Sequence, residues 1–154
     1  MNDLKTILLA EDSPQDVEMT LTALAEHNLA NEVIVVNDGA EALDYLYRRG
    51  KYQARVAGNP GVVLLDLKMP KVSGMDVLRT IKQDETLRSI PIVMLTSSRE
   101  ESDLVNSYRL GVNAYVVKPV AFEAFIKAVK ELGVFWALIN EPPPGDARRL
   151  HPRP

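Results

Sequence analysis

Five side chains of this 154-residue sequence could perform phosphoryl chemistry together, and they lie at the ends of short apolar runs. They are the acids Glu11, Asp12 and Asp66, the hydroxyl of Thr96 and the amine of Lys118. Carboxylates that lie close together repel one another and raise one another's pKa values, so a cluster of three acids needs a cation. Mg²⁺ suits such a cluster, because this ion prefers oxygen ligands in octahedral geometry and keeps several water molecules.

The hydroxyl and the amine suit the other half of the same reaction. Thr96 and Lys118 could hold the oxygens of a dianionic phosphoryl group. Asp66 could then be the nucleophile, because a carboxylate is already ionised at neutral pH and can form an acyl-phosphate. A metal ion and Lys118 would neutralise the charge that builds on the transferring oxygens. The sequence therefore predicts a Mg²⁺-dependent phosphoacceptor site centred on Asp66.

These side chains must be positioned by the elements that carry them. Short apolar runs alternate along the chain with amphipathic stretches, and this pattern predicts repeated strand–helix units. We expect an α/β, flavodoxin-like fold, with a five-stranded parallel sheet in the order 2-1-3-4-5 and five helices on both faces. The expected strands are 6–10, 32–36, 62–65, 91–95 and 114–117, and the expected helices are one opened by 13–16, then 40–49, 75–83, 99–110 and 121–139.

The strand order brings the acids together. In open α/β sheets, ligands bind beyond the carboxyl ends of the strands, where the strand order reverses. The first and third strands are neighbours at that point, so Glu11, Asp12 and Asp66 should converge there. At the start of the first helix, Ser13 can cap the helix and Asp16 completes a capping box.

Composition excludes several other classes of protein. A formal net charge of −3 and a pI near 5.4 give no general attraction to DNA or to anionic membranes. The chain has no cysteine, so a thiol nucleophile and a Cys-ligated zinc site are excluded. It has two histidines, His27 and His151, which makes a His-rich metal site hard to build. No signal peptide and no run long enough to span a bilayer is present, so we expect a cytoplasmic protein.

The motifs around these residues resemble the CheY-like receiver domain of bacterial two-component response regulators. The resemblance extends from about residue 4 to residue 132. Each motif alone is common, but all of them in order, each at a strand end, form a specific pattern. The matching segments are Glu11-Asp12, Leu64 to Pro70 with Gly74, Leu95-Thr96-Ser97 and Tyr115 to Pro119.

The resemblance implies a role for each matched residue around the metal. It makes Asp66 the phosphoacceptor and a metal ligand. Glu11 and Asp12 become the acidic pair that serves Mg²⁺, with Asp12 as a direct ligand. The backbone carbonyl of Lys68, two residues after the acceptor, becomes a further protein ligand.

The resemblance also implies how the signal leaves the site. Thr96 and Lys118 would hold the phosphoryl oxygens, and the Lys118–Pro119 peptide bond would be cis. Tyr115 matches an aromatic switch residue, which turns inward when Thr96 moves toward the phosphate. A half-buried tyrosine on an edge strand can equally be ordinary packing, and the sequence leaves that alternative open.

These roles imply a single-domain response regulator, not an enzyme. It would accept a phosphoryl group from a phosphohistidine on a sensor histidine kinase or a phosphotransfer protein, and signal by conformational switching and protein–protein contact. Residues 1–140 would form the receiver domain, and 141–154 a Pro-rich C-terminal tail. No nucleic acid and no membrane is expected as a partner.

The end of the last predicted helix suggests self-association. The run from Val134 to Ile139 is apolar on all sides, so a second face needs to be covered. Either the proline tail folds over it, or a homodimer forms through Phe135 and Trp136. The long connector at 48–60 and this C-terminal extension also resemble regulators that act with phytochrome-type histidine kinases.

Two other functions are compatible with part of the pattern. A Mg²⁺-dependent aspartyl-phosphate phosphohydrolase would share the aspartyl nucleophile, but such enzymes carry a second acid where this chain has Lys68. A receiver-like adaptor that works without phosphorylation would share the fold. The complete acidic set and Lys118 argue against the adaptor.

Overall fold

Five short strands, each rich in apolar residues, pair in parallel in the computed structural model, which describes residues 3–25, 32–56, 58–97 and 114–132. Their order is β2-β1-β3-β4-β5, so the predicted fold class and strand order are confirmed. The strands are β1 (Asp3–Ala10), β2 (Glu32–Val36), β3 (Pro60–Asp66), β4 (Ile92–Thr96) and β5 (Tyr115–Val117).

The central strands are buried on both sides, as parallel strands between two helical layers must be. Every residue of β3 and β4 is buried. The register places Ala10 beside Leu65, Asp66 beside Leu95 and Thr96 beside Val117. The carboxyl ends of β1, β3, β4 and β5 therefore lie next to one another along one edge of the sheet.

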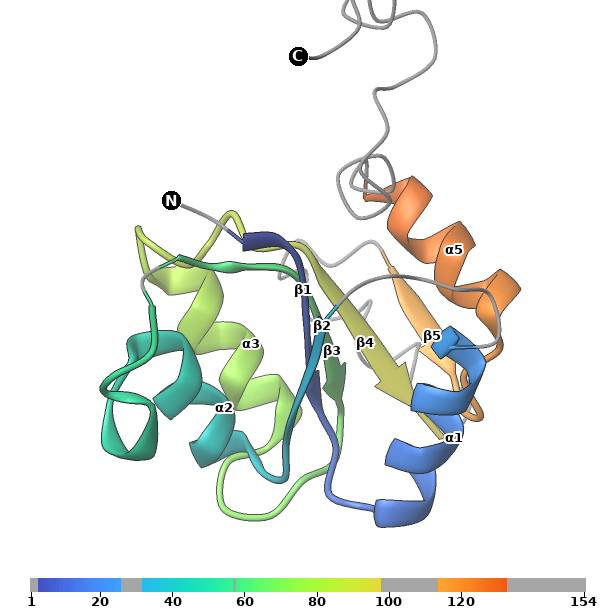
Figure 1. Cartoon of the computed structure of the whole chain (residues 1–154), viewed down its shortest axis with the longest axis horizontal. Helices are drawn as coiled ribbons and strands as arrows, with labels where there is room; N and C mark the ends of the chain where they lie inside the picture. Colours follow the sequence, from blue (N-terminus) through green and yellow to red (C-terminus); the bar gives the residue numbers. More distant parts are fainter. Residues whose placement is uncertain (1–2, 26–31, 57, 98–113, 133–154) are drawn as a thin grey trace, which may run out of the picture.

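Helices cover both faces of the sheet (Figure 1). On one face lie α2 (Gly39–Tyr47) and α3 (Gly74–Gln83), and on the other lie α1 (Pro14–Ala25) and α5 (Phe122–Glu131). Alternate strand residues supply two separate cores: Leu8 and Leu65 pack with α2 and α3, whereas Ile7 and Leu64 pack with α1 and α5. This alternation follows from the two-residue period of a strand.

Among the described residues, the helices differ from the prediction chiefly in the connector after α2. The predicted helix at 99–110 lies outside the described residues, and so does the predicted end of the last helix beyond residue 132. The connector after α2 contains a short 3₁₀ helix, η1 (Gly50–Tyr52), that the sequence analysis did not predict. A three-residue turn has no apolar period by which it could be recognised. Within the described ranges, every helix is too short or too polar to span a bilayer.

Candidate functional site

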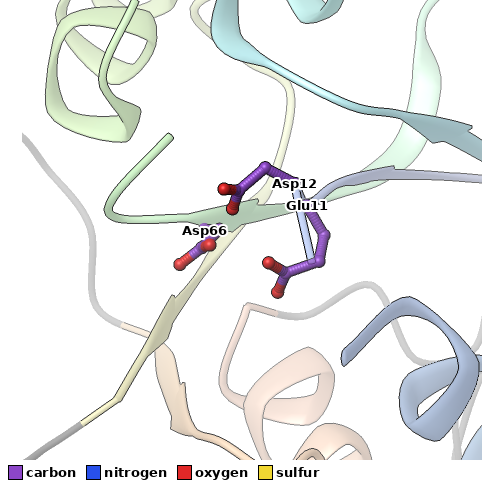
Figure 2. A group of neighbouring side chains, drawn as sticks. All are labelled: Glu11, Asp12 and Asp66. Atoms are coloured by element: carbon purple, nitrogen blue, oxygen red, sulfur yellow. The ribbon is translucent and has the colours of Figure 1, made fainter. Parts of the chain in front are cut away.

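The three predicted acids meet at the carboxyl edge of the sheet (Figure 2). Glu11 and Asp12 follow the last residue of β1, and Asp66 is the last residue of β3. Each contributes an oxygen to a group in which all three oxygens lie within 4.8 Å of one another. Glu11 is fully buried and Asp66 is 5% exposed, whereas Asp12 is open to solvent. An ion could therefore approach from the side of Asp12.

Lys118 brings a positive charge to the same group. Its Nζ lies 3.1 Å from Glu11 Oε1 and 3.4 Å from Asp66 Oδ2. Its backbone N–H donates a hydrogen bond of 2.7 Å to the carbonyl oxygen of Thr96, which joins the ends of β4 and β5. The Lys118–Pro119 peptide bond is cis, as the family resemblance implies. The structure thus places the amine beside the acids.

Asp16 also belongs to this site. Of the two hydrogen bonds of its predicted capping box, one is present and the other is not. Ser13 Oγ accepts a hydrogen bond of 3.3 Å from the backbone N–H of Asp16, as predicted. The backbone N–H of Ser13, however, donates to Glu11 Oε2 at 3.3 Å. The Asp16 carboxylate instead accepts a hydrogen bond of 2.9 Å from Lys118 Nζ. The sequence analysis missed this contact because it joins residues 102 positions apart.

Thr96 is the last residue of β4, and its hydroxyl group is buried. Its side chain is fully buried, and its Oγ1 has no hydrogen-bond partner in the described part of the chain. Leaving a buried hydroxyl unpaired costs about 1–3 kcal/mol. Thr96 follows Leu95, the register partner of Asp66, so this hydroxyl lies at the end of the strand next to the acceptor. Such a group is suited to a ligand that arrives at the sheet edge.

The balance of charge at the site is negative. Burial first, and then the neighbouring Glu11 carboxylate, raise the pKa of Asp66 to about 7, against the opposing effect of Lys118. Burial alone would lower the pKa of Lys118, but hydrogen bonds to Asp16 and Glu11 and the charge of Asp66 raise it above its usual range. One ammonium faces four acids, so an all-oxygen donor set with unbalanced negative charge remains. That chemistry fits a divalent cation such as Mg²⁺.

The loop after β3 is shaped by a glycine. Gly74 N donates to the carbonyl oxygen of Leu67 at 2.9 Å, and a Cβ at Gly74 would lie 2.1 Å from the carbonyl oxygen of Asp66. No side chain larger than hydrogen fits there without moving the loop. Lys68 lies in this loop with an exposed side chain, and the metal-ligand role of its backbone carbonyl stays a prediction.

Three other predicted positions have different outcomes. Tyr115 lies on β5 and is 41% exposed, and its role as a switch residue stays a prediction. Phe135 and Trp136, the predicted dimer contacts, lie outside the described residues.

Comparisons with known proteins agree with this geometry. The family model described as the response regulator receiver domain matches residues 7–130. Response regulator Rcp1 of Synechocystis sp. is 38% identical over 135 residues, covering 88% of this chain and 90% of Rcp1. A crystal structure of Rcp1 in its Mn²⁺-bound form has a TM-score of 0.68 at 38% identity, over 86% of this chain and 94% of that one.

Two solved structures of phytochrome-related regulators are also similar. The bacteriophytochrome response regulator AtBRR is 64% identical with a TM-score of 0.85, over 90% of this chain and 99% of that one. The phosphorylated cyanobacterial phytochrome response regulator RcpA is 41% identical with a TM-score of 0.68, over 86% of this chain and 93% of that one. The predicted resemblance to phytochrome-associated regulators is confirmed, and the chain belongs to the response regulator receiver domain family.

Proposed function

We propose that this protein is a response regulator in which Asp66 accepts a phosphoryl group from the phosphohistidine of a histidine kinase. The observation that carries the proposal is the meeting of three carboxylates within 4.8 Å of one another, with the Lys118 amine 3.4 Å from Asp66. One carboxylate oxygen of Asp66 can then act as the nucleophile, while the other binds a cation.

The reaction is a transfer between two nucleophiles. A carboxylate oxygen of Asp66 attacks the phosphorus atom, a new O–P bond forms, and the P–N bond breaks with its electron pair returning to the imidazole nitrogen. Lys118 holds a phosphoryl oxygen by a charge-assisted hydrogen bond. The buried Thr96 hydroxyl, which lacks a partner in the described residues, donates to another.

The acidic group would hold Mg²⁺ during this step. Glu11, Asp12 and Asp66, with the backbone carbonyl of Lys68, would be its protein ligands, and the ion would supply charge neutralisation for the transferring oxygens. The Mn²⁺-bound form of the relative Rcp1 supports a divalent metal at this site.

The signal would leave through protein–protein contact. Movement of Thr96 toward the phosphoryl group would make room for Tyr115 to turn inward from its exposed position on β5. The surface formed by β5 and α5 would then change. The partners we propose are a phytochrome-type histidine kinase, in the cytoplasm, and a downstream protein target. Support for the kinase class comes from the phytochrome-related names of AtBRR and RcpA.

Asp66→Asn tests the acceptor. We expect the wild type to gain one phosphoryl group from acetyl phosphate with Mg²⁺, and Asp66→Asn to gain none while remaining folded, as intact mass spectrometry and circular dichroism would show. Asp76→Asn, which removes an exposed acid from α3, is the matched control and should accept the group. Phosphorylation of Asp66→Asn would contradict the proposal, and EDTA should abolish uptake by the wild type.

The same material tests the phosphohydrolase alternative. A response regulator should not turn over small phosphomonoesters, whereas an enzyme should release phosphate over many turnovers. Steady-state release that is lost in Asp66→Asn would replace the proposal with the enzymatic function.

A further inference from the structure

The Lys118 ammonium is bound most closely by an acid that stands outside the candidate metal group. The distance from Nζ to Asp16 Oδ2 is 2.9 Å, shorter than the 3.1 Å to Glu11 and the 3.4 Å to Asp66. Asp16 lies in the first turn of α1, and its side chain is 32% exposed, against 0% for Glu11 and 7% for Asp66. Asp16 is therefore not one of the candidate metal ligands, and its carboxylate can bind the amine.

An ammonium has three protons to donate and no capacity to accept. In this structure Lys118 donates to Asp16 and Glu11, and Asp66 is the farthest of the three acids. A phosphoryl group on Asp66 needs this ammonium near its own oxygens. A carboxylate that already binds the ammonium opposes that movement, and its negative charge also opposes the arrival of a dianion.

We propose that Asp16 is a positioning residue that holds Lys118 in the unphosphorylated protein and competes for it with the phosphoryl group on Asp66. This inference rests on the proposed function. It assigns Asp16 an effect of opposite sign on two ligands: the charge of Asp16 favours Mg²⁺ and disfavours the phosphoryl group. Damage to the fold would instead weaken both.

The chain contains a matched control on another helix. The helix α3 begins like α1, because Ser73 Oγ accepts a hydrogen bond of 3.2 Å from the backbone N–H of Asp76, three residues on. The Asp76 carboxylate, however, binds Arg79 of its own helix at 2.8 Å, and it belongs neither to the acidic group nor to the three acids that bind Lys118. Asp76→Asn removes the same charge from the same helical position without touching Lys118.

The variants should fold. The cap of α1 uses the backbone N–H of Asp16, so Ser13 can still accept it when the side chain at 16 is changed. Asp16→Asn keeps the size of the side chain and removes its charge, and Asp16→Ala is a second neutral variant. Asp16→Glu keeps the charge and should restore the wild-type behaviour.

The experiment titrates two probes into the full chain. Mg²⁺ alone is titrated by calorimetry, and fluoroberyllate, a phosphoryl mimic, is then titrated at saturating Mg²⁺ and followed by ¹⁹F NMR. We expect Asp16→Asn to bind Mg²⁺ about two- to fivefold more weakly and fluoroberyllate about three- to tenfold more tightly, from the loss of one nearby charge. Asp16→Glu and Asp76→Asn should match the wild type with both probes.

The outcomes separate this inference from the function on which it rests. If fluoroberyllate binds the wild type and not Asp66→Asn, the proposed function holds. Unchanged or weaker fluoroberyllate binding by Asp16→Asn and Asp16→Ala would then overturn the role of Asp16 alone. If the wild type binds no fluoroberyllate, or Asp66→Asn binds it equally well, the proposed function itself fails.

Discussion

Asp66 is placed where its ionisation works against the fold until a cation arrives. Its pKa of about 7 lies well above the value of 3.8 that an unperturbed aspartate has, chiefly because the side chain is buried. Between these two values the folded state binds a proton that the unfolded state has released. The free energy of unfolding of the metal-free protein should therefore fall as the pH rises from about 4 to 7, and level off above that.

We expect this fall to be about 1–3 kcal/mol for the metal-free wild type. Thermal unfolding in EDTA at pH values from 4.5 to 8 would measure it, and the difference between wild type and Asp66→Asn isolates the contribution of this group. Asp66→Asn should be the more stable protein at pH 7.5, and added Mg²⁺ should stabilise only the wild type. Equal stability of the two proteins at pH 7.5 in EDTA would show that the raised pKa of Asp66 is wrong.

The hydroxyl of Thr96, which has no partner among the described residues, gives a second expectation for a single residue. Thr96→Val replaces the hydroxyl with a methyl group of similar size, so the resting protein should gain about 1 kcal/mol in unfolding free energy. The same variant should bind fluoroberyllate more weakly, because a donor to the phosphoryl oxygens is lost. Chemical denaturation and ¹⁹F NMR would measure the two effects.

Thr96→Ser is the matched variant for this test, since it keeps the hydroxyl and loses the methyl group. It should retain most fluoroberyllate binding. A Thr96→Val protein less stable than wild type would mean that the hydroxyl already has a partner in the resting state.

At the scale of elements, strand β3 and the turn after it decide where the acceptor lies. The strand ends at Asp66, and the chain must then reverse toward α3 within a few residues. Gly74 permits this because its hydrogen occupies the space against the carbonyl oxygen of Asp66, 2.1 Å from where a Cβ would be. The path of the loop that follows the acceptor therefore depends on one glycine, eight positions further along the chain.

Gly74→Ala should be severely destabilising for this reason. We expect a loss of about 3 kcal/mol or more in unfolding free energy, because the added methyl group meets backbone atoms that cannot yield cheaply. Urea denaturation would measure the loss. Gly50→Ala is the comparison: its Cβ would meet only the Asp44 side chain at 3.4 Å, so its cost should be the smaller one of about 1 kcal/mol for a positive φ. Equal costs would refute the steric account of Gly74.

The elements also show what the sequence could predict. Apolar runs revealed all five strands, because burial between two helical layers leaves few polar residues in them, and β2 was predicted with its observed bounds. The first residues of β1 and β3 were not predicted, since they pair in the sheet without being part of the apolar run. The η1 turn left no pattern at all.

The site was also predictable only in part. Residues at strand ends could be identified, because parallel strands bring their carboxyl ends to one edge. Asp16 could not, since its partner Lys118 follows β5 and reaches α1 only in the folded chain, and the sequence offered capping as a complete local explanation. Long-range ion pairs of this kind need the tertiary arrangement.

At the scale of the whole molecule, the proposed homodimer depends on residues beyond α5. A double substitution, Phe135→Ala with Trp136→Ala, should convert the protein to monomers, because it removes the two largest apolar side chains from a run that is apolar on all sides. Sedimentation velocity at several protein concentrations would measure the change. An unchanged sedimentation coefficient would contradict a dimer contact through these two residues. Leu150→Ala, in the tail, controls for general effects of substitutions near the C-terminus.

The backbone hydrogen bond between Lys118 N and Thr96 O has a consequence for how the molecule carries information. This bond joins the backbones of the two residues that would hold the phosphoryl oxygens, so a shift of one residue would be transmitted to the other. Strand β5 is only three residues long and lies at the edge of the sheet, paired with β4. Under the proposed function, a displacement of the Lys118 ammonium toward the phosphoryl group would therefore be passed on to an outer strand.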